Sequence, residues 1–209
     1  MKLYYSPGAC SLAVHIVLLE THRRFDLERV DLKTHRTASG ADFYAINPKG
    51  YVPVLELGSE RLTEASVVLQ YVADLEPNSR LVPPPGTFAR YRLQELLSFL
   101  STEIHKQFGP LFKRDAPESY NSKVRGRIAE RYNYLQDELS DRAFLTGETF
   151  TIADAYLFTL LRWSDQQDID LLLWPNLADY EDRVLQRPSV IQALDEEGLA
   201  IRHRFRRSA

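Results

Sequence analysis

The sequence predicts two structural parts, a small α/β domain followed by an all-helical domain. Strand-like and helix-like patterns alternate through the first 80 residues, which is typical of a mixed α/β layer. Residues 81–86 contain three consecutive prolines and a glycine, a composition found in semi-rigid linkers. Residues 87–209 then show long helical patterns and no strong strand candidate. The predicted boundaries are therefore 1–80, 81–86 and 87–209.

Short strands and a helix open the first domain. Lys2–Tyr5 predicts a strand that ends at a Ser-Pro-Gly turn signal, and Ser11–Glu20 predicts a helix with one apolar face. Phe25–Leu32 has enough apolar and β-branched residues for a second strand. Residues 33–50 are polar and end in Asn-Pro-Lys-Gly, which indicates a loop.

A hairpin and a second helix complete the first domain. Val52–Leu57 predicts a third strand, and Gly58-Ser59 is typical of a tight hairpin turn. Arg61–Leu62 predicts a short fourth strand. A helix follows, opening at Thr63 or Glu64 and ending at residue 74.

Helical periodicity dominates the remaining sequence. The long patterns cover Thr87–Phe108, Ser119–Leu139 and Thr151–Trp163. Two shorter patterns lie near residues 176–186 and 189–197. We therefore expect a bundle of helices after the linker.

Composition and charge are ordinary for a folded soluble protein. The chain has 44% hydrophobic residues, 26% charged residues and a net charge of −3, which gives no reason to expect nucleic-acid binding. The single cysteine excludes an internal disulfide framework and a cysteine-based zinc cluster, and it fits a reducing compartment. No apolar stretch approaches the roughly 20 residues that span a bilayer, and the N-terminus does not fit a signal peptide. We expect a cytoplasmic protein without a metal site, a nucleic-acid partner or a membrane anchor.

The single cysteine, Cys10, directly precedes the predicted helix over 11–20. A free cysteine is commonly a small buried apolar residue. At a helix N-terminus, however, a thiol faces unpaired backbone N–H groups and the positive end of the helix dipole, which both favour the thiolate. We therefore expect a lowered pKa. Cys10 would then be reactive itself, or would lie in a site that stabilises a thiolate brought by a ligand.

Two further positions allow two interpretations each. Pro53 interrupts the third predicted strand, which indicates either an edge strand or a cis Val52–Pro53 bond that turns the Val52 backbone toward an extended peptide ligand. Glu64 either caps the helix that follows, or it holds an amino acid head group together with the N–H groups of Ala65 and Ser66. In the second case the helix end takes the carboxylate and Glu64 takes the ammonium group.

The segments around Cys10, Pro53 and Glu64, in this order and spacing, resemble the cytosolic glutathione transferases, and more closely the bacterial beta class. The resemblance covers essentially the whole chain. Cys10 points to the beta class, because other classes use Tyr or Ser near this position, and Thr151-x-x-Asp154 fits the capping box of the family, which satisfies the first N–H groups of a buried helix. The matching motifs are YYSPGACSLA, NPKGYVPVLEL, LTEASVVLQYVAD, STEIHKQFGPLF and FTIADAYLFTLLRW.

The resemblance implies a thioredoxin-like N-terminal domain that binds glutathione as co-substrate. Cys10 would lie beside the glutathione sulfur and could form a mixed disulfide with it, and Val52 would pair by its backbone with the cysteinyl part. Glu64 and Ala65 would hold the γ-glutamyl end, although the family favours Ser or Gly where Ala65 stands. His35 falls where relatives often carry a Lys that meets the glycyl carboxylate, and a mostly uncharged His weakens this contact at neutral pH.

The resemblance also implies glutathione contacts from the helical domain. His105 matches the family histidine near the thiol, and Ser98 falls where relatives often have Asn. Ser98, Thr102 and His105 lie at three- and four-residue steps, so we expect them on one helix face. Ser98 and Glu103 would reach the glutathione of a second subunit, which makes a homodimer functional. The residues assigned to this group are Ser98, Thr102, Glu103, Ile104 and His105. A second-substrate pocket is expected near Gly109–Phe112 and Arg162–Gln166.

Three functions are compatible with these features. The first is a detoxifying glutathione transferase, in which the Cys10 region and His105 lower the pKa of bound glutathione and its thiolate attacks small, mostly hydrophobic electrophiles. The second is a glutathione-dependent thiol reductase or peroxidase that works through a Cys10 mixed disulfide. The third is a non-catalytic ligand-binding member of the fold, which the departures at His35, Ala65 and Ser98 would suit.

The basic tail Arg202–Arg207 is either solvated or a contact for phosphates or anionic lipid.

Overall fold

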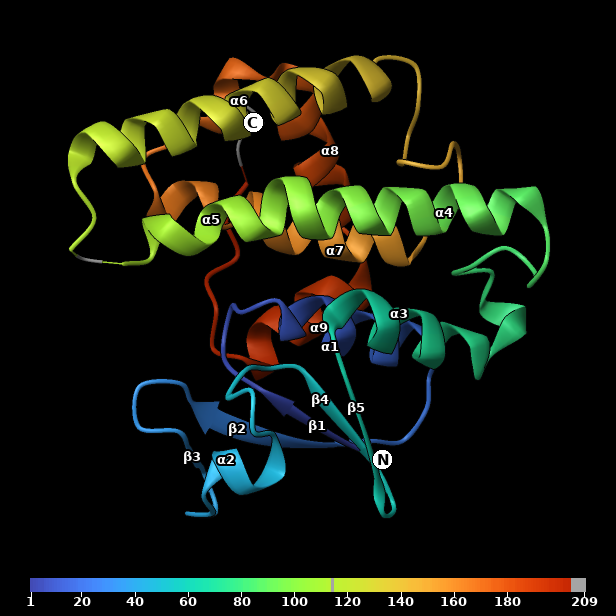
Figure 1. Cartoon of the computed structure of the whole chain (residues 1–209). Helices are drawn as coiled ribbons and strands as arrows, with labels where there is room; N and C mark the ends of the chain where they lie inside the picture. Colours follow the sequence, from blue (N-terminus) through green and yellow to red (C-terminus); the bar gives the residue numbers. More distant parts are fainter. Residues whose placement is uncertain (114, 204–209) are drawn as a thin grey trace. The chain divides into compact units, whose positions relative to one another are not determined.

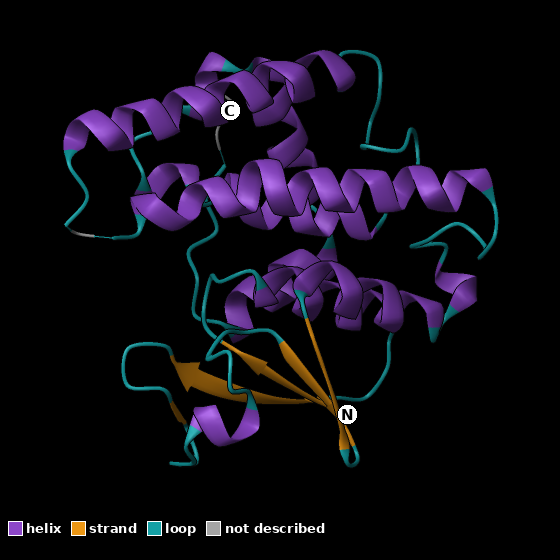
Figure 2. Cartoon of the chain, in the orientation of Figure 1, coloured by secondary structure: helices purple, strands orange, loops and turns teal. Residues whose placement is uncertain are grey.

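The computed structural model describes residues 1–113 and 115–203. Its contacts divide the chain into two compact units. The first unit consists of Met1–Val82 with Arg187–Ile201, and the second is formed mainly by Pro83–Gln186. Among the described residues, all strands of the chain lie in the first unit (Figure 2). Most of the basic tail, residues 204–207, lies outside the described residues.

A mixed five-stranded sheet forms the centre of the first unit, as the α/β prediction requires. The strand order is β3-β2-β1-β4-β5, with β1 parallel to β2 and the other neighbouring pairs antiparallel. This is the thioredoxin-like architecture that the resemblance implied. The strands are β1 (Lys2–Tyr5), β2 (Asp26–Asp31), β3 (Arg36–Thr37), β4 (Val54–Leu57) and β5 (Glu60–Thr63).

The predicted hairpin and its turn are confirmed, although its strands are Val54–Leu57 and Glu60–Thr63 rather than Val52–Leu57 and Arg61–Leu62. Leu57 of β4 pairs with Glu60 of β5, so Gly58 and Ser59 form a two-residue turn. Gly58 has a φ of +64°, which a residue without a Cβ adopts without strain. The turn residues therefore fix the register of the two strands.

Helices cover both faces of this sheet. Figure 1 shows α1 (Ser11–Glu20) and α3 (Ala65–Asp74) on one side and the short α2 (Phe43–Ile46) on the other. On the α2 side, the ring of Phe43 packs 6.1 Å from the ring of Tyr4, centroid to centroid. Leu3 points to the opposite face, because successive strand residues alternate. The sheet is thus buried on both sides.

The polar segment 33–50 is not a simple loop, and this prediction is wrong. It contains β3 and α2. Asp42 begins α2 by accepting a hydrogen bond from the backbone N–H of Tyr44 at 3.1 Å, and Phe43 anchors the turn in the core. Elements of two and four residues are too short to leave a periodic signal.

The last helix, α9 (Pro188–Glu196), also departs from the predicted division at 87–209, because it belongs to the first unit. It packs against α1. The Arg187 guanidinium donates two hydrogen bonds to the Glu20 carboxylate, at 2.8 and 2.9 Å. The buried His15 ring lies between Glu196 and Glu197, at 2.8 and 3.1 Å. These pairs join segments roughly 170 residues apart, so no local pattern could reveal them.

The second unit is helical, as predicted. Its helix α7 is buried along its whole length and contacts α4 and α8. The predicted capping box at its start is present, with Thr151 and Asp154 bonded reciprocally. None of the helices in the described residues is long and apolar enough to cross a membrane. The helices are α4 (Phe88–Phe99), α5 (Lys106–Leu111), α6 (Glu118–Glu138), α7 (Ile152–Leu161) and α8 (Pro175–Leu185), with short helical turns at η3 (Ser164–Gln166) and η4 (Leu171–Leu173). The helical turn η1 (Pro77–Ser79) belongs to the first unit.

The single helix predicted over Thr87–Phe108 is interrupted. A π-helical segment, η2 (Leu100–His105), separates α4 from α5. The wider π-helical turn changes the spacing at which side chains share a face. The three- and four-residue steps between Ser98, Thr102 and His105 therefore no longer place the three side chains on one face. Such segments occur frequently at functional sites.

Candidate active site

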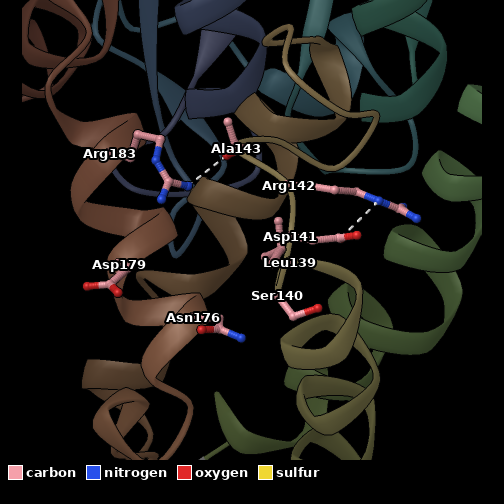
Figure 3. A pocket seen from close by; sticks show the side chains of 8 residues that line it. All are labelled: Leu139, Ser140, Asp141, Arg142, Ala143, Asn176, Asp179 and Arg183. Atoms are coloured by element: carbon pink, nitrogen blue, oxygen red, sulfur yellow. Dashed lines mark hydrogen bonds and ion pairs between the residues drawn. The ribbon is translucent and has the colours of Figure 1, made fainter.

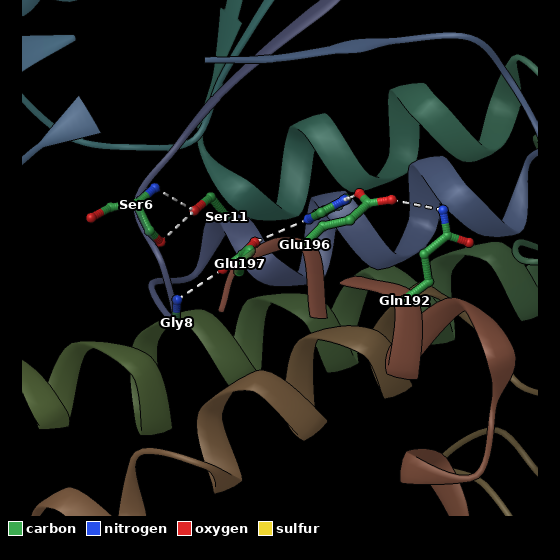
Figure 4. Close-up of polar contacts among 7 residues, drawn as sticks. Ser6, Gly8, Ser11, Gln192, Glu196 and Glu197 are labelled. Carbon is green, nitrogen blue, oxygen red and sulfur yellow. Dashed lines mark hydrogen bonds and ion pairs between the residues drawn. The ribbon is translucent and has the colours of Figure 1, made fainter. Parts of the chain in front are cut away.

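The turn that precedes Cys10 is held at both ends. The Ser11 hydroxyl accepts a hydrogen bond from the Ser6 N–H at 3.2 Å and donates to the Ser6 carbonyl at 3.3 Å. The Gly8 N–H donates to the Glu197 carboxylate at 2.8 Å (Figure 4). Because Glu197 also contacts the buried His15, the turn is tied to α1 and to the end of α9. Cys10 is thereby fixed at the N-terminus of α1.

The Cys10 thiol is buried and neutral, so the expected lowering of its pKa is wrong. Its Sγ donates a hydrogen bond to the Val52 carbonyl at 3.2 Å, which stabilises the protonated form. Burial raises the pKa of Cys10 to about 12, and the negative charge of Glu64 acts in the same direction. The N–H groups of Cys10 and Ser11 oppose this rise but do not outweigh it. The helix end does favour an anion, yet desolvation dominates at this atom.

The Val52–Pro53 peptide bond is cis, which was one of the two interpretations of this segment. Strand β4 begins only at Val54, so Pro53 occupies no ladder position. The Val52 backbone therefore lies at the end of the sheet, directly beside the Cys10 sulfur. Here main-chain groups could pair with an extended peptide.

Glu64 begins α3 in an unusual conformation. Its φ is +68°, and its side chain makes no capping hydrogen bond, so the simple capping interpretation does not hold. A non-glycine residue at positive φ is uncommon and occurs often at ligand sites. The Ala65 and Ser66 N–H groups stand before the first intrahelical bond of α3. Glu64 thus places a carboxylate beside a helix end that attracts anions. Together the two groups match the ammonium and carboxylate groups of an amino acid.

Lys49 is a site residue that the sequence reasoning missed. Its ammonium group lies 2.5 Å from the Glu64 carboxylate and donates to the Thr63 hydroxyl at 2.9 Å. The loop around it is fixed by the buried Asn47, whose amide donates to the Tyr51 carbonyl at 2.7 Å. A lysine in an Asn-Pro-Lys-Gly turn gives no sign of its distant partner, because Glu64 follows 15 residues later.

His35 lies in the same loop region. Its ring packs on Tyr44 with 4.3 Å between centroids, and its Nδ1 is buried with no hydrogen-bond partner among the described residues. Gly50, at a φ of +72°, approaches both rings. An added Cβ would lie 2.7 Å from Tyr44 and 3.2 Å from His35, so only glycine fits.

His105 ends the π-helical segment of the second unit. Its Nδ1 lies 2.6 Å from the hydroxyl of the buried Tyr156, and its ring packs edge-on against Trp163 at 5.0 Å. Phe108 and Phe112 pack against the same tryptophan at 5.5 and 5.4 Å. Phe112 and Trp163 belong to the two regions where the second-substrate pocket was expected, and of these rings only Phe112 is exposed. His105 therefore borders a mostly buried aromatic cluster.

The other predicted residues of this segment differ in accessibility. Ser98 and Thr102 are exposed, and the Thr102 hydroxyl donates to the Ser98 carbonyl at 3.1 Å. Glu103 pairs with Arg131 of α6 at 2.9 Å. The Ile104 side chain is fully buried, which leaves only its backbone for a ligand.

Two surface hollows lie away from all predicted site residues. One, of about 350 Å³, is lined mostly by polar residues from the segment that follows α6 and from α8 (Figure 3). Three of its charged groups have partners inside the protein, since Arg183 donates to the Ala143 carbonyl at 2.8 Å and Arg142 pairs with Asp141. The other, of about 490 Å³, surrounds the Glu20–Arg187 ion pair. Within residues 1–113 and 115–203, no cluster of three or more His, Cys, Asp or Glu side chains could hold a metal ion.

The fold and the first-unit residues together define a thioredoxin-like protein with an added helical unit. Residues 1–74 match the family profile described as glutathione S-transferase, N-terminal domain, and residues 99–188 match that of the C-terminal domain. Glutathione S-transferase GstA of Escherichia coli O157:H7 is 44% identical, covering 95% of this chain and all of the relative.

Solved structures give the same result. The beta-class glutathione S-transferase of Sphingomonas chungbukensis superposes with a TM-score of 0.93 at 45% identity, covering 96% of this chain and all of that one. A sphingomonad glutathione S-transferase complexed with glutathione gives 0.92 at 43% identity, with the same coverage. The chain belongs to the glutathione S-transferase family and, within it, to the bacterial beta class.

Proposed function

We propose that the protein binds glutathione at its first unit and transfers the glutathione thiolate to small, mostly hydrophobic electrophiles. One observation supports this most directly: Cys10, Val52 and Glu64, from three separate segments, converge beside the N-termini of α1 and α3. A helix end that favours an anion, backbone groups at the end of the sheet and a carboxylate next to N–H donors match the sulfur, the peptide bonds and the amino acid end of glutathione.

The site residues have distinct roles in this proposal. Val52 pairs by its backbone with the cysteinyl part, while Glu64 takes the α-ammonium group and the Ala65 N–H takes the α-carboxylate. His35 faces the glycyl carboxylate as a donor. Lys49 neutralises part of the Glu64 charge and keeps its carboxylate oriented.

The reacting anion in this proposal is the sulfur of glutathione, not that of Cys10. The Cys10 and Ser11 N–H groups and the α1 dipole favour negative charge at the mouth of the helix, and His105 supplies a further donor. Lowering a thiol pKa from about 8.5–9 to about 6.5 requires roughly 3 kcal/mol, which two or three such interactions supply. The thiolate then forms a C–S bond while the electrophile loses its leaving group or accepts the electron pair.

The alternative chemistry through a Cys10 mixed disulfide is less consistent with the site. Disulfide exchange needs a thiolate, and the Cys10 sulfur is buried with a pKa of about 12. The high pKa therefore favours conjugation over thiol reduction.

We further propose that the protein works in the cytoplasm as a homodimer, in which Ser98 and Glu103 approach the glutathione of the other subunit. The exposure of Ser98 and the family relationship support this assembly. Sedimentation equilibrium should give twice the chain mass at micromolar concentration. A monomer that retains full conjugating activity would exclude a functional role for the dimer.

Replacing Glu64 with glutamine tests the glutathione site. We expect kcat/KM for glutathione to fall about 10- to 100-fold, mostly through KM, because a charge-assisted hydrogen bond of about 1.5–3 kcal/mol is lost. Steady-state kinetics with a chlorinated nitroarene measure this change. Glu60→Gln, which changes an exposed carboxylate at the start of the preceding strand β5, is the matched control and should stay within twofold. Equal kinetics for the two variants would contradict the proposed role of Glu64.

A further inference from the structure

Tyr156 lies against His105 inside the second unit. Its hydroxyl oxygen is 2.6 Å from His105 Nδ1, and its side chain is only 1% exposed. It projects from α7, which is buried along its whole length and begins with the capping box at Thr151. The phenol is therefore presented from a rigid element, and the short distance makes it a close partner of the imidazole.

The His105 ring is also restricted by its other neighbours. It packs edge-on against Tyr156 at an interplanar angle of 85° and against Trp163 at 70°. Trp163 is itself held by edge-on contacts with Phe108 and Phe112. Flipping the imidazole would exchange Nδ1 for a carbon atom at the Tyr156 hydroxyl and lose this hydrogen bond. The aromatic surroundings thus leave one favoured orientation of the ring.

The hydrogen bond also couples the tautomer of His105 to the direction of donation, since the Tyr156 hydroxyl can donate to Nδ1 or accept from it. A neutral imidazole has one N–H donor and one acceptor nitrogen, and the partner of one nitrogen sets the role of the other. If the Tyr156 O–H donates to Nδ1, the imidazole proton resides on Nε2. We propose that Tyr156 is a positioning residue that holds His105 in the Nε2–H tautomer, so that the ring acts as a donor through Nε2. The consequence for catalysis rests on the proposed function, in which His105 donates toward the glutathione sulfur.

The tautomer can be measured without glutathione, by ¹⁵N NMR of the imidazole groups at about pH 8, above the ordinary pKa range of histidine. The chain has five histidines, and His105→Gln identifies the relevant signals. We expect the wild-type protein to show unprotonated Nδ1 and protonated Nε2 at His105, and Tyr156→Phe to give a mixture of tautomers. Tyr132→Phe is the matched control, because it removes the hydrogen bond of another buried phenol, 2.8 Å from the Ser164 hydroxyl. It should leave the His105 signals unchanged.

Kinetics test the catalytic consequence separately. We expect Tyr156→Phe to lower kcat for conjugation about three- to tenfold while the glutathione KM stays within twofold. Added to His105→Gln, the same substitution should cause no further loss, because its effect passes through His105. An Nδ1–H tautomer in the wild type, unchanged signals in Tyr156→Phe, or independent and multiplicative losses in the double variant would each overturn the proposal. Absence of conjugation in the wild type would overturn the proposed function, while the NMR result still decides the tautomer.

Discussion

Asp154→Ala is expected to lower the free energy of unfolding by about 3–5 kcal/mol. The Asp154 carboxylate is fully buried and accepts four hydrogen bonds. One oxygen receives the Leu145 N–H and the Tyr180 hydroxyl, both at 2.9 Å. The other receives the N–H and the hydroxyl of Thr151, at 2.8 and 2.9 Å. Alanine would leave these donors buried without an acceptor and would remove the capping box of α7.

Urea denaturation followed by circular dichroism measures this loss. Asp141→Ala is the matched control, since Asp141 is 80% exposed and lies 3.7 Å from its partner Arg142. An exposed pair at this distance contributes little, so the control should stay within about 0.5 kcal/mol of the wild type. If Asp154→Ala also stayed within that range, the buried carboxylate would not stabilise the second unit as expected.

The second large effect concerns the reactivity of Cys10. With a pKa of about 12, only about one thiol in 10⁵ is ionised at pH 7, compared with a few per cent of an exposed cysteine thiol. We expect iodoacetamide to alkylate Cys10 in the folded protein about a thousandfold more slowly than in the urea-unfolded protein. The folded-state rate should rise about tenfold per pH unit from 7 to 10, because the pKa is raised and the thiolate fraction keeps increasing.

Mass spectrometry of timed samples measures both rates on the one cysteine of the chain. Cys10→Ala should keep kcat/KM for conjugation within about threefold of the wild type, since the residue supplies no anion. Rapid alkylation at pH 7, with a plateau above pH 8, would show that the helix end outweighs burial and that Cys10 is itself reactive.

The sequence predicted those features of the fold that depend on nearby residues. Helix Ser11–Glu20 has the predicted bounds, and the hairpin at Gly58-Ser59 and the capping box at Thr151 are present. Each of these depends on residues within a few positions of one another, so their pattern is visible in the chain. The π-helical segment at Leu100–His105 was missed, because its residues fit an ordinary helix equally well.

The energetics of the site could not be predicted in the same way. The expected low pKa of Cys10 followed from the local helix end, but its actual environment comes from distant segments. The Val52 carbonyl that accepts its hydrogen bond is 42 residues away, and Glu64 lies at the start of a different helix. Lys49 and Tyr156 were missed for the same reason, because their partners are 15 and 51 residues distant.

A thiolate titration by ultraviolet difference spectroscopy tests the central claim most directly, namely that this site holds the anionic sulfur of glutathione and a neutral Cys10. Alone, the protein should show no thiolate absorbance below about pH 9, as a Cys10 pKa of about 12 requires. With saturating glutathione, one thiolate per chain should appear with a midpoint near pH 6.5, about two units below that of the free tripeptide. A thiolate near neutral pH in the protein alone, or bound glutathione that ionises only in its free-solution range, would contradict the account.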